Sequence, residues 1–355
     1  YLDTNRRVKQ IKMRGTLSEG LWLPISCLSY LSTDLSVFKE GTTLTSVGQI
    51  EFIKRYITPA QFEGQKNKEK TPKSSTMPMF KEHVDTANLR YTIHSIPEGA
   101  NLILTLKMHG TSGRTGHVIR NIPLTSWQKK WNTWFGKWIR FTEPQEWVTV
   151  SGTRKTVLSP GEGDGWYKSN FRQQSHDQIA PQLYKGETIY YEIVGWTAPT
   201  GPPVQKGINL ADDPIRKQLS KDLKTNYMHW AYGCKPGETG IYIYRITHTD
   251  IDNHTTELAW SQIQARAEEL GIPAVPTIKT ITYQAEDKEE LLTYLKDYCS
   301  KPDPLFPDQV VEGICVRIEC PTQFGRILKY KGDLFSYLEG RVRDLPDFID
   351  VEEMS

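Results

Sequence analysis

The sequence lacks the long apolar run that a membrane-spanning helix needs. None of its hydrophobic segments approaches ~20 residues, and no secretory signal pattern opens the chain. Only five of the 355 residues are cysteine, an odd number without a Cys-x-x-Cys pair. This usage argues against a disulfide framework and a zinc knuckle, and it favours a reducing, cytoplasmic compartment. We therefore expect no membrane partner.

A large excess of charge of one sign is also missing. Lys and Arg total 44 against 42 Asp and Glu, which leaves a net charge of +2. That balance alone says little about nucleic-acid binding. The basic residues are clustered, however, and a local cluster of basic residues indicates nucleic-acid binding better than the net charge does. Apolar residues make up 37% of the chain, enough for a sizeable core, and this length favours two domains. Because the chain begins at Tyr1 instead of Met, we expect an N-terminal truncation or renumbering.

The first 80 residues differ from the rest. Up to about residue 60, short β-prone segments alternate with Gly and Pro, as in a small barrel or sandwich. Residues 63–78 lack periodicity and are rich in Lys, Ser and Thr, which is typical of a surface loop or linker. We therefore predict one domain at 1–80 and a second at 81–355.

The second domain mixes longer strands with helices. We expect strands at 101–108, 147–158, 187–196, 240–249, 310–318 and 326–332, and helices at 126–140, 211–224, 255–271 and 287–300. Gly271, followed by Pro273, suits a helix C-cap, and Asp287 with Glu290 suggests a capping box. Strands and helices do not alternate regularly, so the pattern predicts an α+β fold with antiparallel sheets flanked by helices.

One predicted strand ends in a lysine, in "LILTLKMHGTSGRTGHVIR". A lysine there is usually a solvated edge residue, and a P-loop is excluded because no G-K-[ST] follows. The alternative is a covalent nucleophile. An unperturbed lysine amine is only about 0.1% neutral near pH 7.4, and lowering its pKa by three units costs roughly 4 kcal/mol. Desolvation and nearby cations would have to supply that energy for Lys107. The following turn offers close backbone approach at Gly110 and donors to a ribose or phosphate: Thr111, Ser112 and Arg114.

Two carboxylates lie in apolar strands. Glu192 occurs in "YYEIVG" and Glu312 in "VVEGICVRI". A carboxylate flanked by aliphatic residues must pair with a cation or bind a metal. A structural ion pair is the commoner explanation for one such residue, whereas two of them downstream of a nucleophile candidate favour Mg²⁺ and ribose binding.

Lys329 and Lys331 lie two residues apart in "ILKYKG", which places both on one face of a strand. Like charges on one face repel each other, so a bound polyanion such as a triphosphate would explain the pair. Gatekeeper lysines on a solvated edge explain the pair alone equally well. In the triphosphate interpretation the same cations would help to lower the pKa of Lys107.

Aromatic residues mark another strand, "IYIYRI". Period two places Tyr242 and Tyr244 on one face and Arg245 on the other. A tyrosine on a sheet can stack on a purine, although core packing explains aromatic residues in strands more often.

Taken in order, "KMHGT", "YYEIVG", the aromatic strand, "EGICVR" and "LKYKG" resemble the successive motifs of the covalent nucleotidyltransferases, which include polynucleotide ligases and mRNA-capping enzymes. The resemblance covers about residues 84–335. His109 stands where DNA ligases and capping enzymes typically carry Asp, so the chain is most similar to ATP-dependent RNA ligases. This implies an adenylyltransferase domain preceded by an OB-like module.

The resemblance also implies roles for the matched residues. Lys107 would attack the α-phosphorus of ATP and form a lysyl-AMP intermediate. Glu192 would contact the ribose, and Glu312 would hold a catalytic Mg²⁺ or Mn²⁺. Lys329 and Lys331 would bind the phosphates, one of them stabilising the α-phosphate during attack.

Other matched positions are expected to bind ATP. Arg154 corresponds to a substrate-positioning arginine of the family. Tyr244 corresponds to the adenine-stacking position, with Tyr242 as the alternative. The turn after the lysine adds three residues to the expected ATP site: His109, Gly110 and Arg114.

The implied substrate is RNA with 3′-OH and 5′-phosphate ends, including nicks in a duplex, and we expect a monomer. DNA ligation and GTP-dependent capping are disfavoured by His109 and by the short segment, residues 332–355, that follows the last lysine motif. A catalytically silent RNA-binding module would require the loss of motif residues, and the main ones are all present.

The OB-like module would lie at the N-terminus, as in one group of RNA ligases. "VKQIKMRGTLSEGLWLP" is similar to the middle of that module, and the strands before it are missing. Lys9, Lys12 and Arg14 could contact phosphates, and a structural role for them is equally compatible with the sequence.

One segment, "SWQKKWNTWFGKWIRF", has no firm motif match. Its four tryptophans fall at helical spacing: Trp127, Trp131, Trp134 and Trp138. Lys129, Lys130, Lys137 and Arg140 fill much of the remainder. We favour a helix that packs its tryptophans on the sheet over the alternative, a basic and aromatic lid on duplex RNA.

Overall fold

The computed structural model describes residues 77–135, 141–158, 170–211, 214–319 and 326–339, together with short pieces of the first 51 residues. The chain divides into two compact units, 1–70 and 71–355. The described pieces of the first unit include two small antiparallel pairs and two 3₁₀ turns: β1 (Ile11–Met13) with β2 (Thr16–Ser18), β3 (Ser46–Val47) with β4 (Ile50–Glu51), Ile25–Leu28 and Leu35–Val37.

These pieces do not show an OB-like barrel, so the barrel and the domain boundary near residue 80 stay predictions. Residues 63–76 of the expected loop lie outside the described residues, as do Lys9 and Arg14, while Lys12 lies in β1. Residues 77–80 pack instead on the second unit, because Met77, Met79 and Phe80 are buried in a small cluster with β7 and β9 residues.

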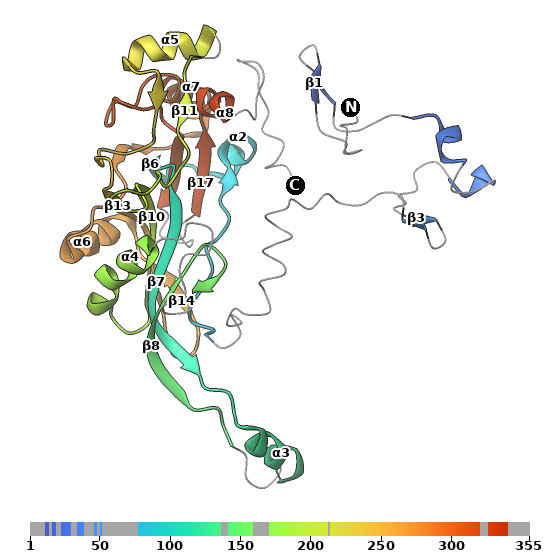
Figure 1. The fold of residues 1–355 in the computed structure, drawn as a ribbon, viewed down its shortest axis with the longest axis vertical. Helices are drawn as coiled ribbons and strands as arrows, with labels where there is room; N and C mark the ends of the chain where they lie inside the picture. Colours follow the sequence, from blue (N-terminus) through green and yellow to red (C-terminus); the bar gives the residue numbers. More distant parts are fainter. Residues whose placement is uncertain are drawn as a thin grey trace. The chain divides into compact units, whose positions relative to one another are not determined.

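The second unit contains two large sheets, which Figure 1 shows in the body of the molecule. The six-stranded sheet has the order β14-β13-β10-β7-β8-β9, and the five-stranded sheet has the order β15-β6-β16-β17-β5. All described pairings within them are antiparallel except the parallel pair β17–β5. The predicted antiparallel α+β architecture is therefore confirmed.

The strands of the six-stranded sheet are β7 (Thr111–Asn121), β8 (Gln145–Gly152), β9 (Val157–Leu158), β10 (Glu187–Gly195), β13 (Thr239–Thr249) and β14 (Thr255–Glu257). Those of the five-stranded sheet are β5 (Ala87–Asn88), β6 (Asn101–Lys107), β15 (Thr277–Thr282), β16 (Gly313–Glu319) and β17 (Arg326–Lys331). A separate short pair joins β11 (Ile208–Asn209) and β12 (Tyr227–Met228).

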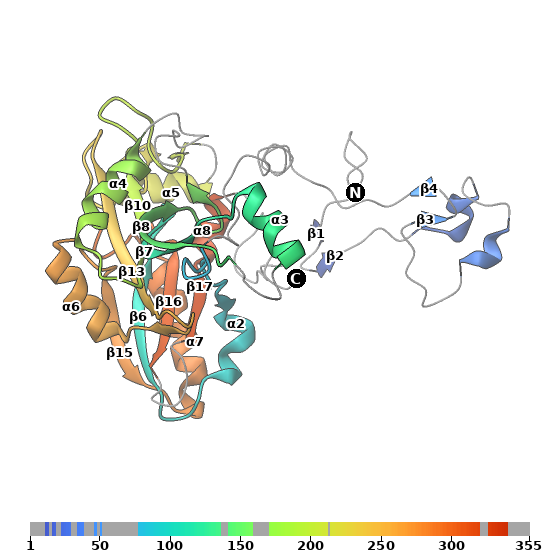
Figure 2. The same ribbon diagram turned by 90° about the horizontal axis from the view of Figure 1, so that it is seen from below.

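Helices cover the outside of the sheets, as Figure 2 shows for α2, α6 and α7. The described helices of this unit are α2 (Leu89–Thr92), α3 (Ser126–Phe135), α4 (Phe171–Ile179), α5 (Pro214–Leu223), α6 (Trp260–Leu270), α7 (Lys288–Cys299) and α8 (Asp333–Leu338). Helix α6 contacts β13, α7 contacts β16, and α4 contacts β7.

Strand alternation builds the core. In β6 the leucines at 102, 104 and 106 are buried, and they belong to one apolar cluster with residues of β10, β13, β16 and the covering helices. Because neighbouring residues of a strand point to opposite faces, the intervening positions, which end in Lys107, face the other way. In β6, one face therefore packs in the core, and the opposite face, which includes Lys107, is available for a functional site.

Several local predictions need correction. Helix α6 begins at Trp260, because residues 255–257 pair with β13 as strand β14. Gly271 does cap this helix in the left-handed conformation, with φ +64°. The predicted capping box at Asp287 is wrong, since its Oδ2 accepts a hydrogen bond from the backbone N–H of Gln284 (3.0 Å) in the preceding 3₁₀ turn and makes no cap to α7.

The tryptophan-rich helix also differs from the favoured expectation. Trp127 is 61% exposed and Trp134 is 76% exposed, so they do not pack on a sheet. Trp131 lies against Trp127 and Phe141 instead, and Trp138 lies outside the described residues. Figure 1 shows α3 at the end of the long β7–β8 ribbon. The amphipathic pattern predicts the helix correctly but not its partner surface.

No helix in the described part of the chain is long and apolar enough to cross a membrane.

Candidate active site

Strand register brings the predicted lysines together. Lys107, the last residue of β6, lies opposite Gly313 of β16, which in turn lies opposite Lys331 of β17. Two rows along the sheet, and therefore on the same face, Cys315 lies opposite Lys329. Because residues directly opposite each other share a face of the sheet, all three lysines point to the same side.

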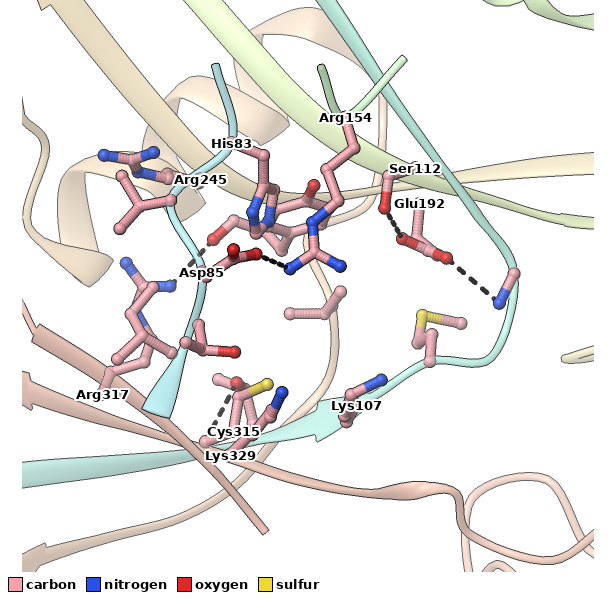
Figure 3. Close-up of a pocket in the computed structure, with 18 of the residues that line it drawn as sticks. His83, Asp85, Lys107, Ser112, Arg154, Glu192, Arg245, Cys315, Arg317 and Lys329 are labelled. Carbon is pink, nitrogen blue, oxygen red and sulfur yellow. Dashed lines mark hydrogen bonds and ion pairs between the residues drawn. The ribbon is translucent and has the colours of Figure 1, made fainter. Parts of the chain in front are cut away.

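A cavity of about 1120 Å³ opens on this side. Its walls come from both large sheets and from residues 81–87 (Figure 3). The cavity brings together most of the residues predicted from the sequence: Lys107, His109, Gly110, Arg154, Glu192, Tyr244, Glu312, Lys329 and Lys331. Two predicted ATP ligands, Arg114 and Tyr242, do not line it.

The Lys107 ammonium forms an ion pair with Oε1 of Glu312, which is almost completely buried. Burial by itself would lower the pKa of Lys107, but the adjacent carboxylate outweighs it and raises that pKa above the ordinary value. We expected Lys329 and Lys331 to lower it. That expectation is wrong for the unliganded protein, because a charge in direct contact dominates more distant cations.

The same contact acts on the carboxylate. Burial favours the protonated form of Glu312, but Lys107 and His109 hold the pKa at about 2, below the ordinary 4.5. This carboxylate therefore stabilises the fold above pH ~4.5 and loses that contribution as the pH falls towards 2. Its second oxygen, Oε2, is buried and has no hydrogen-bond partner among the described residues.

His109 is fixed by its surroundings. Its ring lies edge-on between Trp230 and Phe335, with centroid distances of 4.7 and 4.8 Å. Nδ1 lies 3.5 Å from Glu312, and Nε2 lies 3.6 Å from Glu339. The histidine therefore bridges two carboxylates and helps to orient Glu312.

Glu192 is the second carboxylate of the site, and it is half-buried. It accepts hydrogen bonds from the backbone N–H of Gly110 and from Ser112 Oγ, both at 3.1 Å. Burial raises its pKa to about 7, although Lys107 opposes the shift. A side chain at Gly110 would collide with the Glu192 side chain, since a Cβ would lie 2.9 Å from its Cγ. The same Cβ would overlap the backbone oxygen of Ile193, so the close approach of β10 requires glycine at position 110.

The next two glycines serve packing as well. A Cβ at Gly113 would overlap the ring of Tyr191, and one at Gly116 would approach the ring of Phe80 to 2.9 Å. These two glycines make room for core aromatic rings, so close approach to a nucleotide does not explain them.

A β-bulge places Tyr244 in the cavity. Along the β10–β13 pair, Tyr190 lies opposite Arg245 and Tyr191 lies opposite Ile243, which leaves Tyr244 as an extra residue. A bulge re-aims the side chains beside it. Tyr244 and Arg245 therefore both line the cavity, and the prediction that Arg245 lies on the opposite face is wrong.

Tyr242 is held away from the cavity lining. Its hydroxyl donates to the backbone oxygen of Tyr232 at 3.4 Å. His83 lies beside Tyr244, with ring centroids 5.5 Å apart, and burial lowers its pKa to about 4. The neutral His83 ring was missed by sequence reasoning, since it lies outside every quoted motif.

Two arginines of the cavity were also missed. Arg245 pairs with Glu257 at 2.9 Å, and Arg317 lies 3.6 Å from the same carboxylate. Arg317 also donates to the backbone oxygen of Tyr244 at 2.8 Å. Arg317 lies two residues after Cys315 in the same strand, so strand alternation could have placed it on the cavity face. Arg245 could not be found in this way, because the bulge at Tyr244 changes the face to which it points.

Arg114 has a different position from the one expected. It is only 1% exposed, lies over the ring of Phe80 at 4.2 Å, and donates to the backbone oxygens of Phe80 and Lys81. Tyr190 Oη donates to the same Lys81 oxygen. Arg114 therefore holds the segment that enters the cavity wall at residues 81–87.

Arg154 lies at the other end of that wall. It lines the cavity, and its guanidinium pairs with Asp85, as Figure 3 shows. Its backbone oxygen accepts a hydrogen bond from the N–H of His83 at 3.1 Å. The wall segment is thus fixed on both sides of His83.

The RNA ligase family model matches residues 100–331, more than half of the chain. The protein therefore belongs to the RNA ligase family, which confirms the predicted class of enzyme and makes RNA its substrate class. A search of curated proteins gave no match.

Solved structures show more distant likeness. Naegleria gruberi RNA ligase with pyrophosphate matches at a TM-score of 0.46 and 15% identity, over 95% of this chain and 77% of that one. An archaeal ATP-dependent RNA ligase matches at 0.40 and 15%, over 73% and 50%. A putative ATP-dependent DNA ligase from Aquifex aeolicus matches at 0.41 and 10%, over 78% and 57%. The family assignment depends on the family model and not on these structures.

The position of Arg114 predicts a loss of stability on substitution. Arg114→Met should reduce the free energy of unfolding by about 2–3 kcal/mol, because the buried oxygens of Phe80 and Lys81 lose a charged donor. Arg114→Lys should recover only part of this, since both bonds come from Nη1, which the shorter lysine side chain does not replace, and an ammonium does not stack on the Phe80 ring as a guanidinium does. Urea unfolding followed by fluorescence measures the change. Unchanged stability with a raised KM for ATP would instead return Arg114 to the nucleotide site.

The ion pair predicts how the lysine titrates. In Glu312→Gln the pKa of Lys107 should fall below its wild-type value, because burial is then opposed by no adjacent charge. Competitive labelling of lysine amines across a pH series, with peptide mass spectrometry, gives this pKa. Glu192→Gln is the matched control and should have a smaller effect. A Lys107 pKa that is unchanged or higher in Glu312→Gln would show that the pair does not control it.

Proposed function

We propose that this RNA ligase depends on ATP and that Lys107 is its covalent nucleophile. The observation that carries the proposal is the arrangement of one half-buried lysine, one buried and one half-buried carboxylate, and two further lysines around one cavity. Attack by Nζ on the α-phosphorus would form a phosphoramidate bond and release pyrophosphate. The AMP would then pass to an RNA 5′-phosphate, and a 3′-hydroxyl would displace it.

In the proposed complex the adenine lies at Tyr244 and the phosphates lie at the lysines. Tyr244 offers an aromatic face for the adenine, and the neutral His83 beside it can hydrogen-bond to the base edge. Glu192, at the turn after Lys107, is placed to accept from the ribose hydroxyls. Lys331 shares a row of the sheet with Lys107, and Lys329 lies two rows away on the same face, so both would supply cations for the phosphates.

Glu312 is suited to a divalent metal. Its Oε2 is buried without a hydrogen-bond partner among the described residues, and Mg²⁺ prefers carboxylate oxygens. When bound, Mg²⁺ or Mn²⁺ would neutralise charge on the phosphates and the leaving pyrophosphate. Lys107 has no lone pair as an ammonium, so its pair with Glu312 must separate and Nζ must lose a proton before attack.

The ends that we propose as substrates are a 3′-hydroxyl and a 5′-phosphate, including those at a nick in duplex RNA, and we propose that a monomer acts on them. DNA ligation, GTP-dependent capping and a silent RNA-binding module remain distinct outcomes of the first experiment below.

Incubation with Mg²⁺ and α-labelled ATP should transfer label to the protein. Lys107→Ala and Lys107→Arg should both abolish it, since arginine retains the charge but is not a nucleophile. Lys301→Ala, at an exposed lysine, is the matched control and should keep the wild-type signal. Label from GTP alone would indicate capping, and none from either nucleotide would indicate a silent module. A comparison of sealing on nicked RNA and on nicked DNA then shows which nucleic acid is the substrate.

The stacking role distinguishes the two tyrosines. Tyr244→Leu should raise the KM for ATP about tenfold, because one aromatic stack on a base contributes about 1–3 kcal/mol. Tyr244→Phe should stay near wild type. Tyr242→Leu should change KM little, since that ring does not line the cavity. A larger effect at Tyr242 than at Tyr244 would reverse the assignment.

A further inference from the structure

Side-chain hydrogen bonds hold helix α3 at the end of the β7–β8 ribbon. Asn132 donates to the backbone oxygen of Phe141 (2.9 Å) and accepts from its N–H (2.8 Å). At the other end, the backbone N–H and hydroxyl of Thr125 donate to the side chain of Gln128. These contacts fix the helix between the two strands, so its surface is presented in a defined orientation.

The helix exposes aromatic rings that its own folding does not need. Trp131, Trp127 and Phe141 form one small cluster. Trp134 is 76% exposed. Seven residues separate Trp127 from Trp134, which places their side chains on one side of the helix and ~10.5 Å apart along its axis. Trp134 and the 61%-exposed Trp127 together form an exposed aromatic surface at the end of the ribbon, and such a patch is typical of a binding surface.

The chain segment that carries these rings is basic. Between Glu98 and Glu143 the sequence contains no acidic residue. The basic residues of the same stretch are Lys107, Arg114, Arg120, Lys129, Lys130, Lys137 and Arg140. Lys129 and Lys130 lie on α3 and are exposed. The surface therefore complements a polyanion.

The ribbon connects this surface to the active site. Gly110 and Ser112, at the beginning of β7, line the cavity. From Thr111 to Asn121 a strand rises ~33 Å at about 3.3 Å per residue. This corresponds to roughly ten stacked nucleotides at ~3.4 Å each.

From these observations we propose that α3 binds single-stranded RNA about ten nucleotides from the ends being joined, with Trp134 and Trp127 stacking on unpaired bases and Lys129 and Lys130 contacting phosphates. The inference rests on the proposed ligase function. A single strand fits better than a duplex, because aromatic side chains stack on splayed bases, whereas duplex RNA is recognised through its phosphates and 2′-hydroxyls.

Binding assays with a fluorescent, unstructured oligoribonucleotide test the surface directly. Trp134→Leu keeps an apolar side chain but removes the π face, and it should weaken binding about tenfold. Trp134→Phe should restore most of the affinity. Lys129→Glu with Lys130→Glu should also weaken binding and flatten its salt dependence. Ile251→Ala, at another exposed apolar side chain (76%), is the matched control and should bind like wild type.

Two measurements distinguish a failure of this inference from a failure of the proposed function: sealing as a function of RNA flank length, and lysyl-AMP formation. Sealing of RNA with single-stranded flanks longer than about ten nucleotides should fall in Trp134→Leu, while shorter flanks and lysyl-AMP formation should be unaffected. Absence of label in the wild type would refute the proposed function and leave the binding assays valid. Wild-type RNA affinity in both Trp134→Leu and the double lysine variant would overturn the inference and point to a protein partner. An equal loss for blunt duplex RNA would overturn the choice of a single strand.

Discussion

The arrangement of the active site depends on one interaction, the buried ion pair of Lys107 with Glu312. The two residues are distant in sequence, and they meet because β6 and β16 are adjacent and in register. A buried charge without a partner is strongly unfavourable, so the pair fixes both side chains at the cavity. It also raises the pKa of Lys107 above the ordinary lysine value, so the amine is protonated at neutral pH. In the proposed mechanism, Lys107 must separate from Glu312 and lose a proton before it can attack ATP.

The remaining groups of the site are positioned by packing around that pair. Glu192 is held against the turn after Lys107 through Gly110 and Ser112, and His109 is held between two aromatic rings. The third wall of the cavity is a segment outside both sheets, which Arg114 fastens to the body of the unit. Each of these contacts leaves a functional group with little freedom, as a preorganised site requires.

Motif order and strand periodicity were sufficient to predict the antiparallel α+β fold and the residues that meet at the cavity. They failed where the structure departs from regular geometry or depends on distant contacts. The bulge at Tyr244 reverses the face of Arg245, and no two-residue period contains that information. The partners of Arg114 are backbone oxygens, which have no signature in the side chains. The helix with Trp134 was expected to pack on a sheet, because an amphipathic pattern does not show that a ribbon carries the helix away from the core.

Glu312 sets the charge state of Lys107 in the nucleotide-free protein, and we propose that nucleotide binding shifts Lys107 towards its neutral form. The most direct measurement is the pKa of the Lys107 Nζ by nitrogen NMR of ¹⁵N-lysine protein, free and with Mg²⁺ and an ATP analogue that cannot be cleaved at the α-phosphorus. We expect the pKa of Lys107 to lie above the ordinary lysine value in the free protein and to decrease markedly in the complex. A pKa already depressed in the free protein, or one that does not change on binding, would contradict it.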